Sequence, residues 1–264
     1  GYTSTRLTDG ERAAKFAVIW GSPNTRGPTD VSRLNRFYIA GAHAPGDTLQ
    51  LDAERSNYLC RALRMGEGDE LDIFDGVGGL YRCKVSHAHQ RRAKVEVLER
   101  ESSVAKPENA PSLAIALLKG QAMDRAIQQA TELGAQRIWL LQGARSNLTL
   151  KQERLEQKLD HWQRIIASAC EQCGQLWLPS LHEPRTVADC LEQQTGEVQL
   201  IAFEPEGDPM PPRLEADNPL IFVGPEGGWK DEEKHLFQDK HAAIYRLGRT
   251  ILRAETMPAV GIAL

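Results

Sequence analysis

The sequence has no apolar run long enough to cross a membrane, and its first thirty residues lack the apolar centre of a signal peptide. We therefore expect a cytoplasmic protein. Cysteines are also few, five in all, and their odd number and scatter over both halves do not favour a disulfide framework. With 264 residues and 41% hydrophobic content, the chain can bury the cores of one large domain or two modest ones.

No complete metal-binding motif is present. Cys170 and Cys173 have C-x-x-C spacing, but no second pair and no pair of histidines completes a zinc site. His87 and His89 lie in a polar loop without nearby acidic or cysteine partners. We therefore expect no bound metal, and we interpret the C-x-x-C pair as the end of a helix.

A strong positive charge is missing as well, because the formal net charge is −4. Phosphate contacts dominate the affinity of proteins for nucleic acids, so this balance excludes a uniformly basic binding face. Any RNA-binding surface must therefore consist of local basic patches.

The most informative stretch runs from Leu220 to Met257. Its unbroken apolar run 220–223 predicts a strand buried on both faces, which ends in the glycine-rich loop 224–228. Downstream we expect a helix from Lys230 with an acidic first turn, a strand over 242–247, a loop over 248–253 and a final helix.

Two glycine-containing loops at the carboxyl ends of neighbouring buried strands form a ligand cleft in an open α/β sheet. Both loops could instead be ordinary turns. The sequence GPEGG differs from the phosphate-binding fingerprints G-x-G-x-x-G and G-x-x-x-x-G-K-[ST]. We therefore expect backbone contact with a flat ligand, and not a nucleotide phosphate.

The first part of the chain predicts a small β-rich domain. Residues 33–100 contain short alternating runs separated by turn residues, with a helical segment over 53–65 and a hairpin turn at 75–79. Together these elements predict a small barrel. Residues 1–32 are expected to form an irregular extension, and the polar, proline-containing segment 101–111 a linker.

After the linker the pattern changes to buried strands separated by helices, which predicts an α/β domain over 112–264. Its expected strands are 113–118, 137–141 and 198–203, and its expected helices are 121–134 and 150–173. The third of these strands ends at Glu204–Gly207, which we expect to form a third loop facing the same cleft as GPEGG.

Two motifs resemble those of a known family. The sequence GPEGG, followed by Leu247, Gly248, Leu252, Arg253, Glu255 and Thr256 in the pattern LGxxxLRxET, resembles the C-terminal signature of the SPOUT-class 16S ribosomal RNA uridine-N3 methyltransferases, the RsmE family. Upstream, RALRMGEGDELDIFDG resembles the PUA-like RNA-binding domain that precedes the SPOUT domain in this family. The resemblance covers nearly all of residues 33–264.

This resemblance implies a PUA-like β-barrel followed by a SPOUT-type, mostly parallel sheet with helices on both faces and a deep trefoil knot. It also implies S-adenosylmethionine bound in a bent conformation, a homodimer with shared active sites, and 16S ribosomal RNA within the small ribosomal subunit as substrate. Two alternatives stay open: a SPOUT methyltransferase that acts on a different RNA, and a non-catalytic RNA-binding assembly factor.

Uridine N3 is weakly acidic, so its methylation requires a positioned sulfonium methyl group and help in removing a proton. We expect Arg253 to stabilise the negative charge that develops on the uracil carbonyls, and Glu226 or Glu255 to act as the base. Alternatively, Arg253 pairs with Glu255 and the carboxylates cap helices. The expected cofactor-binding residues belong to the three loops: Phe203, Glu204, Gly224, Pro225, Glu226, Gly227, Leu247, Gly248, Ile251, Leu252, Arg253 and Thr256.

Basic residues at family positions are the candidates for RNA phosphate contacts, with solvated surface arginines as the alternative. The chain departs from the family at two positions, where Ala144 replaces a glutamate and Gln175 replaces an arginine. The candidate RNA-binding residues are Arg33, Arg36, Arg61, Arg64 and Arg145.

Overall fold

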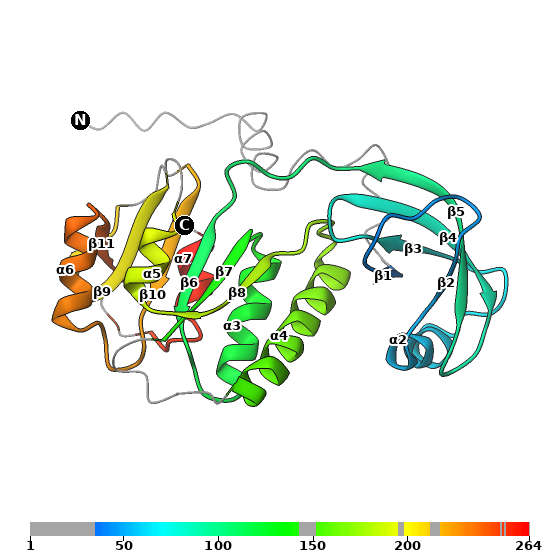
Figure 1. The fold of residues 1–264 in the computed structure, drawn as a ribbon, viewed down its shortest axis with the longest axis horizontal. Helices are drawn as coiled ribbons and strands as arrows, with labels where there is room; N and C mark the ends of the chain where they lie inside the picture. Colours follow the sequence, from blue (N-terminus) through cyan, green and yellow to red (C-terminus); the bar gives the residue numbers. More distant parts are fainter. Residues whose placement is uncertain are drawn as a thin grey trace, which may run out of the picture. The chain divides into compact units, whose positions relative to one another are not determined.

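Two β-sheets make up the computed structural model (Figure 1), which describes residues 35–142, 152–194, 198–211, 217–248, 250 and 252–263. The N-terminal sheet has five strands in the order β1-β3-β4-β5-β2, and the C-terminal sheet has six in the order β11-β9-β10-β6-β7-β8. Both belong to one compact unit, Asn35–Leu264. No described helix is long and apolar enough to cross a bilayer.

The N-terminal sheet is small and curled (Figure 1) and has its own core. Side chains alternate along its long strands, so that Tyr81, Cys83 and Val85 are buried between more exposed neighbours. A short helix, α2, continues directly into a π-helical turn, η1. The elements are β1 (Arg36–Tyr38), β2 (Thr48–Gln50), α2 (Ala53–Asn57), η1 (Tyr58–Ala62), β3 (Glu70–Phe74), β4 (Gly79–His87) and β5 (Lys94–Ser103).

The predicted hairpin turn at 75–79 is confirmed by the antiparallel pairing of β3 with β4. The carboxylate of Asp75 organises this turn, because its Oδ1 accepts hydrogen bonds of 2.8 Å from the amides of Val77 and Gly79. The structure differs from the sequence prediction at the following boundary. Strand β5 continues to Ser103, so the first three residues of the predicted linker 101–111 belong to the sheet.

Neighbouring strands of the C-terminal sheet are all parallel. Helices cover both of its faces, as expected for a parallel sheet whose strands are continuously apolar. The strands are β6 (Ser112–Ala116), β7 (Arg137–Leu141), β8 (Ser180–Arg185), β9 (Gln199–Pro209), β10 (Pro219–Val223) and β11 (Ala243–Arg246). The helices are α3 (Gln121–Glu132), α4 (Gln152–Cys173), α5 (Val187–Glu192), α6 (Asp231–Asp239) and α7 (Met257–Ala263).

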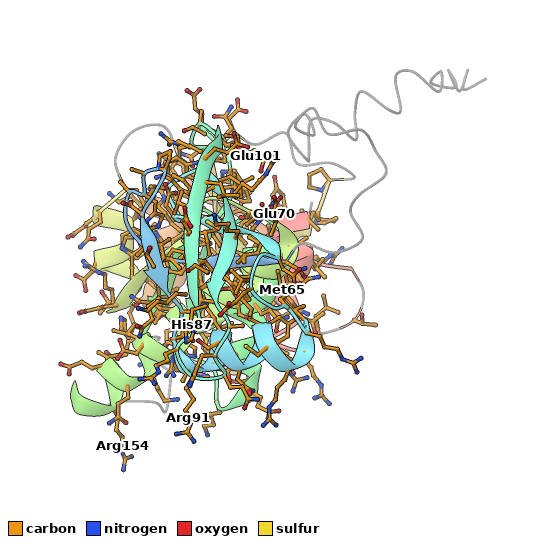
Figure 2. All side chains as sticks on the ribbon, turned by 90° about the vertical axis from the view of Figure 1, so that its right-hand side faces the viewer. Met65, Glu70, His87, Arg91, Glu101 and Arg154 are labelled. Atoms are coloured by element: carbon orange, nitrogen blue, oxygen red, sulfur yellow. The ribbon has the colours of Figure 1, made fainter. Side chains whose placement is uncertain are left out.

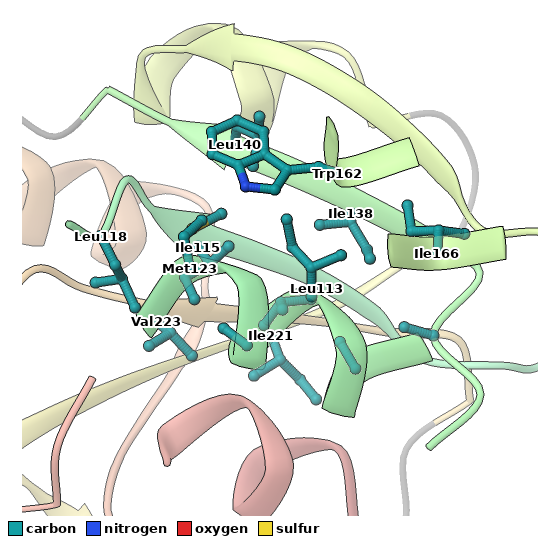
Figure 3. Packing of buried hydrophobic residues seen from close by; sticks show 14 of the residues in the cluster. Leu113, Ile115, Leu118, Met123, Ile138, Leu140, Trp162, Ile166, Ile221 and Val223 are labelled. Carbon is teal, nitrogen blue, oxygen red and sulfur yellow. The ribbon is translucent and has the colours of Figure 1, made fainter. Parts of the chain in front are cut away.

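One face of the sheet packs against α3, α4 and α7 (Figures 1 and 3), with Trp162 and Ile166 of α4 and Met123 of α3 among the buried side chains. The indole nitrogen of Trp162 is satisfied by a 3.1 Å hydrogen bond to Asp124. The other face packs against α5 and α6. The predicted parallel α/β architecture is therefore confirmed, whereas the trefoil knot stays a prediction.

Two parts of the C-terminal sheet differ from the sequence prediction. The predicted loop Glu204–Gly207 is wrong, because β9 continues through it to Pro209 and pairs with β11 beyond a shift in register. Strand β8 and helix α5 were not predicted. Strand β8 is the polar edge strand of the sheet and is only half-buried, so its sequence SLHEPR lacks the apolar run of its neighbours.

The end of α4 joins the two sheets. Glu171 Oε1 accepts a 2.9 Å hydrogen bond from the Tyr38 amide and a 2.8 Å bond from Nε of Arg55. Backbone bonds from Gly78 to Leu176 and from Leu178 to Gly76 extend this contact. The residues 171–178 therefore fix the N-terminal sheet on the C-terminal one.

The C-x-x-C pair lies in the same turn of α4, whose end at Gly174 was correctly predicted. Cys170 is fully buried. The hydrogen bond with Cys173, and then burial, raise the pKa of the Cys170 thiol. Within the described chain no group of three or more His, Cys, Asp or Glu residues could hold a metal ion. Cys170 packs in the hydrophobic cluster on one face of the C-terminal sheet.

Candidate functional site

Three neighbouring strands of the C-terminal sheet reach the same level, where β6 and β10 end and β9 continues past Phe203. Ala202 of β9 pairs with Phe222 of β10, and Val223 of β10 pairs with Ile115 of β6. The residues that follow, Phe203 and the glycine-rich loop 224–228, therefore lie at one edge of the sheet. This edge, at the carboxyl ends of parallel strands, is where ligands bind in open α/β sheets.

A buried tryptophan fixes the glycine-rich loop to β9. Trp229 is 2% exposed, and its Nε1 donates a 3.0 Å hydrogen bond to the carbonyl of Phe203. Its ring lies so close to Gly224 that a Cβ there would meet it at 3.0 Å. Glycine at this position therefore allows the loop and β9 to come together. The sequence analysis did not identify Trp229, although its position directly after GPEGG was a possible signal.

The glycine-rich loop itself is a tight turn in which the Gly228 amide donates a 2.9 Å bond to the carbonyl of Pro225. Gly228 has a φ of +70°, a conformation that favours glycine. Pro225 is buried, whereas Glu226 and Gly227 are exposed. Helix α6 follows with an acidic first turn, as predicted.

The segment after β11 returns to the same edge. Leu247 and the buried Ala254 belong to the hydrophobic cluster that contains Phe203 and Val223. Helix α7 then packs closely on the sheet at Gly261, where a Cβ would meet the Phe203 ring at 2.7 Å. Residues of the three predicted segments thus belong to one hydrophobic cluster, in which Trp229 and α7 contact Phe203. Among the other candidates, Gly248 is exposed with a φ of +71°, Leu252 is half-buried and Ile251 lies outside the described residues.

Glu204 offers a polar group at this edge. Its Oε1 forms a 2.7 Å ion pair with Lys234 of α6, and this hydrogen bond raises the pKa of Lys234. Its Oε2 is buried and has no hydrogen-bond partner within the described chain. Because an unpartnered buried acceptor is costly, a ligand with hydroxyl or amino donors would complete this site.

Of the candidate catalytic residues, Arg253 and Glu226 are exposed, whereas Glu255 is half-buried. The side chain of Arg253 is 86% exposed, and its distance of 4.0 Å from Glu255 is at the limit of an ion pair. Such a contact contributes little to stability, so it does not explain an arginine at this position. Glu226 lies at the exposed turn of the glycine-rich loop, and Thr256 directly precedes α7, where an N-cap residue is expected.

The candidate RNA-binding arginines have different surroundings. Arg61 and Arg64 are exposed. Arg36 is half-buried and donates a 2.9 Å bond to the carbonyl of Gly174, and burial lowers its pKa. This contact favours a structural role for Arg36 at the junction of the two sheets. Arg33 and Arg145 lie outside the described residues.

Gln175, which replaces a family arginine, also has a structural contact. Its Nε2 donates a 2.7 Å hydrogen bond to the carbonyl of Thr131, near the end of α3. This bond satisfies one of the carbonyls that a helix leaves unpaired at its C-terminus. The amide side chain therefore links the ends of two helices.

Comparison with known proteins gives the family. A family model described as an RNA methyltransferase domain matches residues 106–264, and one described as an RNA methyltransferase PUA domain matches residues 51–98. The ribosomal RNA small subunit methyltransferase E of Synechocystis is 34% identical over 86% of this chain and 76% of that protein. Its namesake from Mycobacterium tuberculosis is 28% identical over 86% of this chain and 88% of that protein.

Solved structures show the same fold with a cofactor. The ribosomal RNA small subunit methyltransferase E of Neisseria gonorrhoeae, bound to S-adenosyl methionine, is 26% identical with a TM-score of 0.77, over 88% of this chain and 96% of that one. A Legionella pneumophila protein in complex with SAM is 26% identical with a TM-score of 0.79, over the same shares of both chains. The chain therefore belongs to the family of ribosomal RNA small subunit methyltransferase E, with a PUA domain preceding its RNA methyltransferase domain.

Proposed function

We propose that this protein is an S-adenosylmethionine-dependent methyltransferase that methylates N3 of a uridine in 16S ribosomal RNA. The names of its relatives and the SAM-bound structures support the reaction and the cofactor. The observation that carries the proposal is that Phe203, the end of β10 and the segment after β11 share one hydrophobic cluster, with the glycine-rich loop bonded to Phe203 through Trp229. Uridine N3 as the target rests on the resemblance to the RsmE family.

The converging segments fit the chemistry of the cofactor. Backbone groups of loops 224–228 and 247–256 can contact an adenine edge, and the half-buried Leu247 and Leu252 supply apolar walls. The unpartnered Oε2 of Glu204 is a hydrogen-bond acceptor for hydroxyl or amino donors of the ligand. When bound, S-adenosylmethionine supplies an electrophilic methyl group on a positively charged sulfur.

For methyl transfer, the protein must accept one proton and stabilise one developing negative charge. The reaction forms a bond between N3 and the methyl carbon, breaks the bond from that carbon to sulfur, and releases the N3 proton. Glu226 and Glu255 are the carboxylates that we propose as acceptors of this proton. The exposed guanidinium of Arg253 faces solvent, where it can donate hydrogen bonds to the uracil carbonyls as they become negative.

The assembled enzyme has further proposed features. We infer a homodimer, because the apolar helix α7 leaves Ala259, Val260 and Ile262 only half-buried. We also infer that the chain after β11 forms the trefoil knot of the SPOUT fold, and that the substrate is RNA of the small ribosomal subunit in the cytoplasm. Light scattering on the purified protein tests the dimer, since a monomer at all concentrations would contradict it.

The reaction is tested by mass-spectrometric nucleoside analysis of 16S ribosomal RNA from cells with and without the gene. We expect 3-methyluridine to disappear when the gene is deleted and to return when it is restored. An unchanged nucleoside profile in 16S RNA, with a methylated nucleoside lost from another RNA, would indicate a different substrate. Unchanged profiles in all RNA fractions, together with failure to bind S-adenosylmethionine, would indicate a non-catalytic assembly factor.

The role of Trp229 leads to a separate prediction. Trp229→Phe keeps an aromatic ring beside the glycine-rich loop but leaves the buried carbonyl of Phe203 without its indole donor, which costs about 1–3 kcal/mol. We expect the dissociation constant for S-adenosylmethionine, measured by calorimetry, to rise about tenfold.

Trp177→Phe is the matched control for this experiment. It also removes an indole hydrogen bond to a backbone carbonyl, that of Val104, but at the junction of the two sheets. It should lower the melting temperature and leave cofactor affinity unchanged. Equal cofactor affinities for wild type and Trp229→Phe would show that Trp229 does not organise the site.

A further inference from the structure

A group of arginines gathers at one end of the N-terminal sheet. Arg61 ends η1 and Arg64 follows it, while Arg91 and Arg92 lie in the hairpin loop between β4 and β5. All four are exposed. In Figure 2, His87 and Arg91 lie at one end of this sheet, with Met65 on the neighbouring turn, whereas Glu101 lies toward the opposite end.

The two elements are held next to each other by buried contacts. The Ser56 hydroxyl is fully buried between them, accepting a 2.9 Å bond from the Ala93 amide and donating a 3.2 Å bond to the carbonyl of Leu51. At the surface, Arg61 donates a 3.1 Å bond to Gln90 of the hairpin loop. These bonds hold the hairpin loop and the segment α2–η1 next to each other.

These arginines also differ from the other basic residues of the same sheet. Arg55 pairs with Asp52 and Glu171, Arg82 with Glu99 and Glu101, and Lys84 with Glu96. Within the described chain, none of Arg61, Arg64, Arg91 and Arg92 has a carboxylate partner. The neighbouring His87 has an acidic partner, Glu67, at 3.4 Å. A cluster of unpaired like charges is unfavourable by itself, and binding of an anion relieves that repulsion.

The backbone at this surface is unusual as well. Arg64 has a φ of +56°, which is uncommon for a residue other than glycine, and it directly follows a π-helical turn. Short π-helical segments are frequent at functional sites. The guanidinium group binds phosphate through two parallel hydrogen bonds, so several fixed arginines suit a chain of phosphates.

We propose that Arg61, Arg64, Arg91 and Arg92 form one binding surface for the RNA phosphate backbone, which we call the arginine surface. The hairpin loop that supplies Arg91 and Arg92 is thereby part of the RNA contact and not a passive connection. This inference rests on the proposed function, because that function supplies the RNA partner. It predicts a sequence-independent contact, since phosphates carry no base information.

The test compares the full-length wild type with the double variant Arg61→Ala/Arg91→Ala. The probe is a protein-free 16S ribosomal RNA transcript, and binding is measured by filter retention over a range of salt concentrations. We expect at least tenfold weaker binding at low salt, and a decrease of about two in the slope of log affinity against log salt. The variant Arg61→Lys/Arg91→Lys should recover the salt slope, because it keeps the charge, but only part of the affinity, because lysine cannot make the two parallel hydrogen bonds.

Arg82→Ala is the matched control, because it removes an arginine of the same sheet that is already paired with carboxylates. It should leave the RNA affinity and the salt slope unchanged. An unchanged salt slope for the double alanine variant would contradict the proposal that the arginine surface binds RNA. An equal loss of RNA affinity for Arg82→Ala would contradict it as well.

Failure of this surface is distinguishable from failure of the proposed function. If the wild type methylates the transcript and the double alanine variant binds RNA as tightly, only the surface is wrong. If the wild type transfers no methyl group to any ribosomal RNA, yet the double variant shows the expected decrease in slope, the surface stands and the proposed reaction is wrong. Calorimetry should give the same cofactor affinity for all variants.

Discussion

Arg253→Ala is expected to reduce kcat/KM for methyl transfer to RNA by about 100- to 1,000-fold. At the same time, the dissociation constant for S-adenosylmethionine should stay within about tenfold of wild type. The reason is the position of the side chain, which is 86% exposed and makes only a 4.0 Å contact with Glu255. An interaction that forms with the uracil as it loses its proton affects the transition state and not the bound ground state.

Two further variants test this assignment. Arg246→Ala removes another exposed arginine from the end of β11 and should retain activity within a few-fold of wild type. Glu255→Gln keeps the shape of the described side-chain partner of Arg253 but removes its carboxylate. Because the 4.0 Å ion pair contributes little, a large loss of methyl transfer would indicate that Glu255 acts as the base. Methyl transfer by Arg253→Ala at the wild-type rate would remove Arg253 from the mechanism. A parallel loss of cofactor binding would instead assign it to holding the loop.

The sequence predicted most of the C-terminal sheet, because its buried strands are continuous apolar runs. Strand β7 has the predicted bounds, 137–141, and α4 ends at Cys173 before Gly174 as predicted. Both depend on local patterns, namely an apolar run and a glycine that ends a helix. The polar edge strand β8 has no such pattern, and its position follows only from pairing with β7.

Contacts between distant segments could not be predicted in the same way. The bond from Trp229 to Phe203 joins residues 26 apart, and the contacts of Glu171 with Tyr38 and Arg55 join residues more than 100 apart. Nothing in the local sequence near Arg36 shows that it binds the end of α4. For the candidate site, the glycine-rich loop and the LRAET segment were identified from sequence, but the residues that hold them together were not.

The second large effect is expected at this junction between the sheets. Gly78→Ala should destabilise the protein by about 2–4 kcal/mol, from strain at a positive φ and from overpacking. Gly78 has a φ of +96°, and a Cβ there would lie 2.2 Å from the carbonyl oxygen of Val104 and 2.7 Å from Nε1 of Trp177. These two atoms form a 2.8 Å hydrogen bond with each other. The added methyl group must therefore separate a bond that links β5 to the segment after α4.

Differential scanning calorimetry measures this effect, which corresponds to a decrease in melting temperature on the order of 10 °C for a chain of this size. Gly68→Ala is the matched control, because Gly68 has a φ of +92° but nothing within 4 Å of a Cβ. It isolates the backbone strain, about 1 kcal/mol. Equal melting temperatures for the two variants would show that the junction accommodates the methyl group without a loss of stability. We expect a larger decrease in melting temperature for Gly78→Ala. If this variant also methylates RNA more slowly but binds the cofactor with unchanged affinity, the cofactor site forms without an intact junction, and the junction positions the RNA at that site.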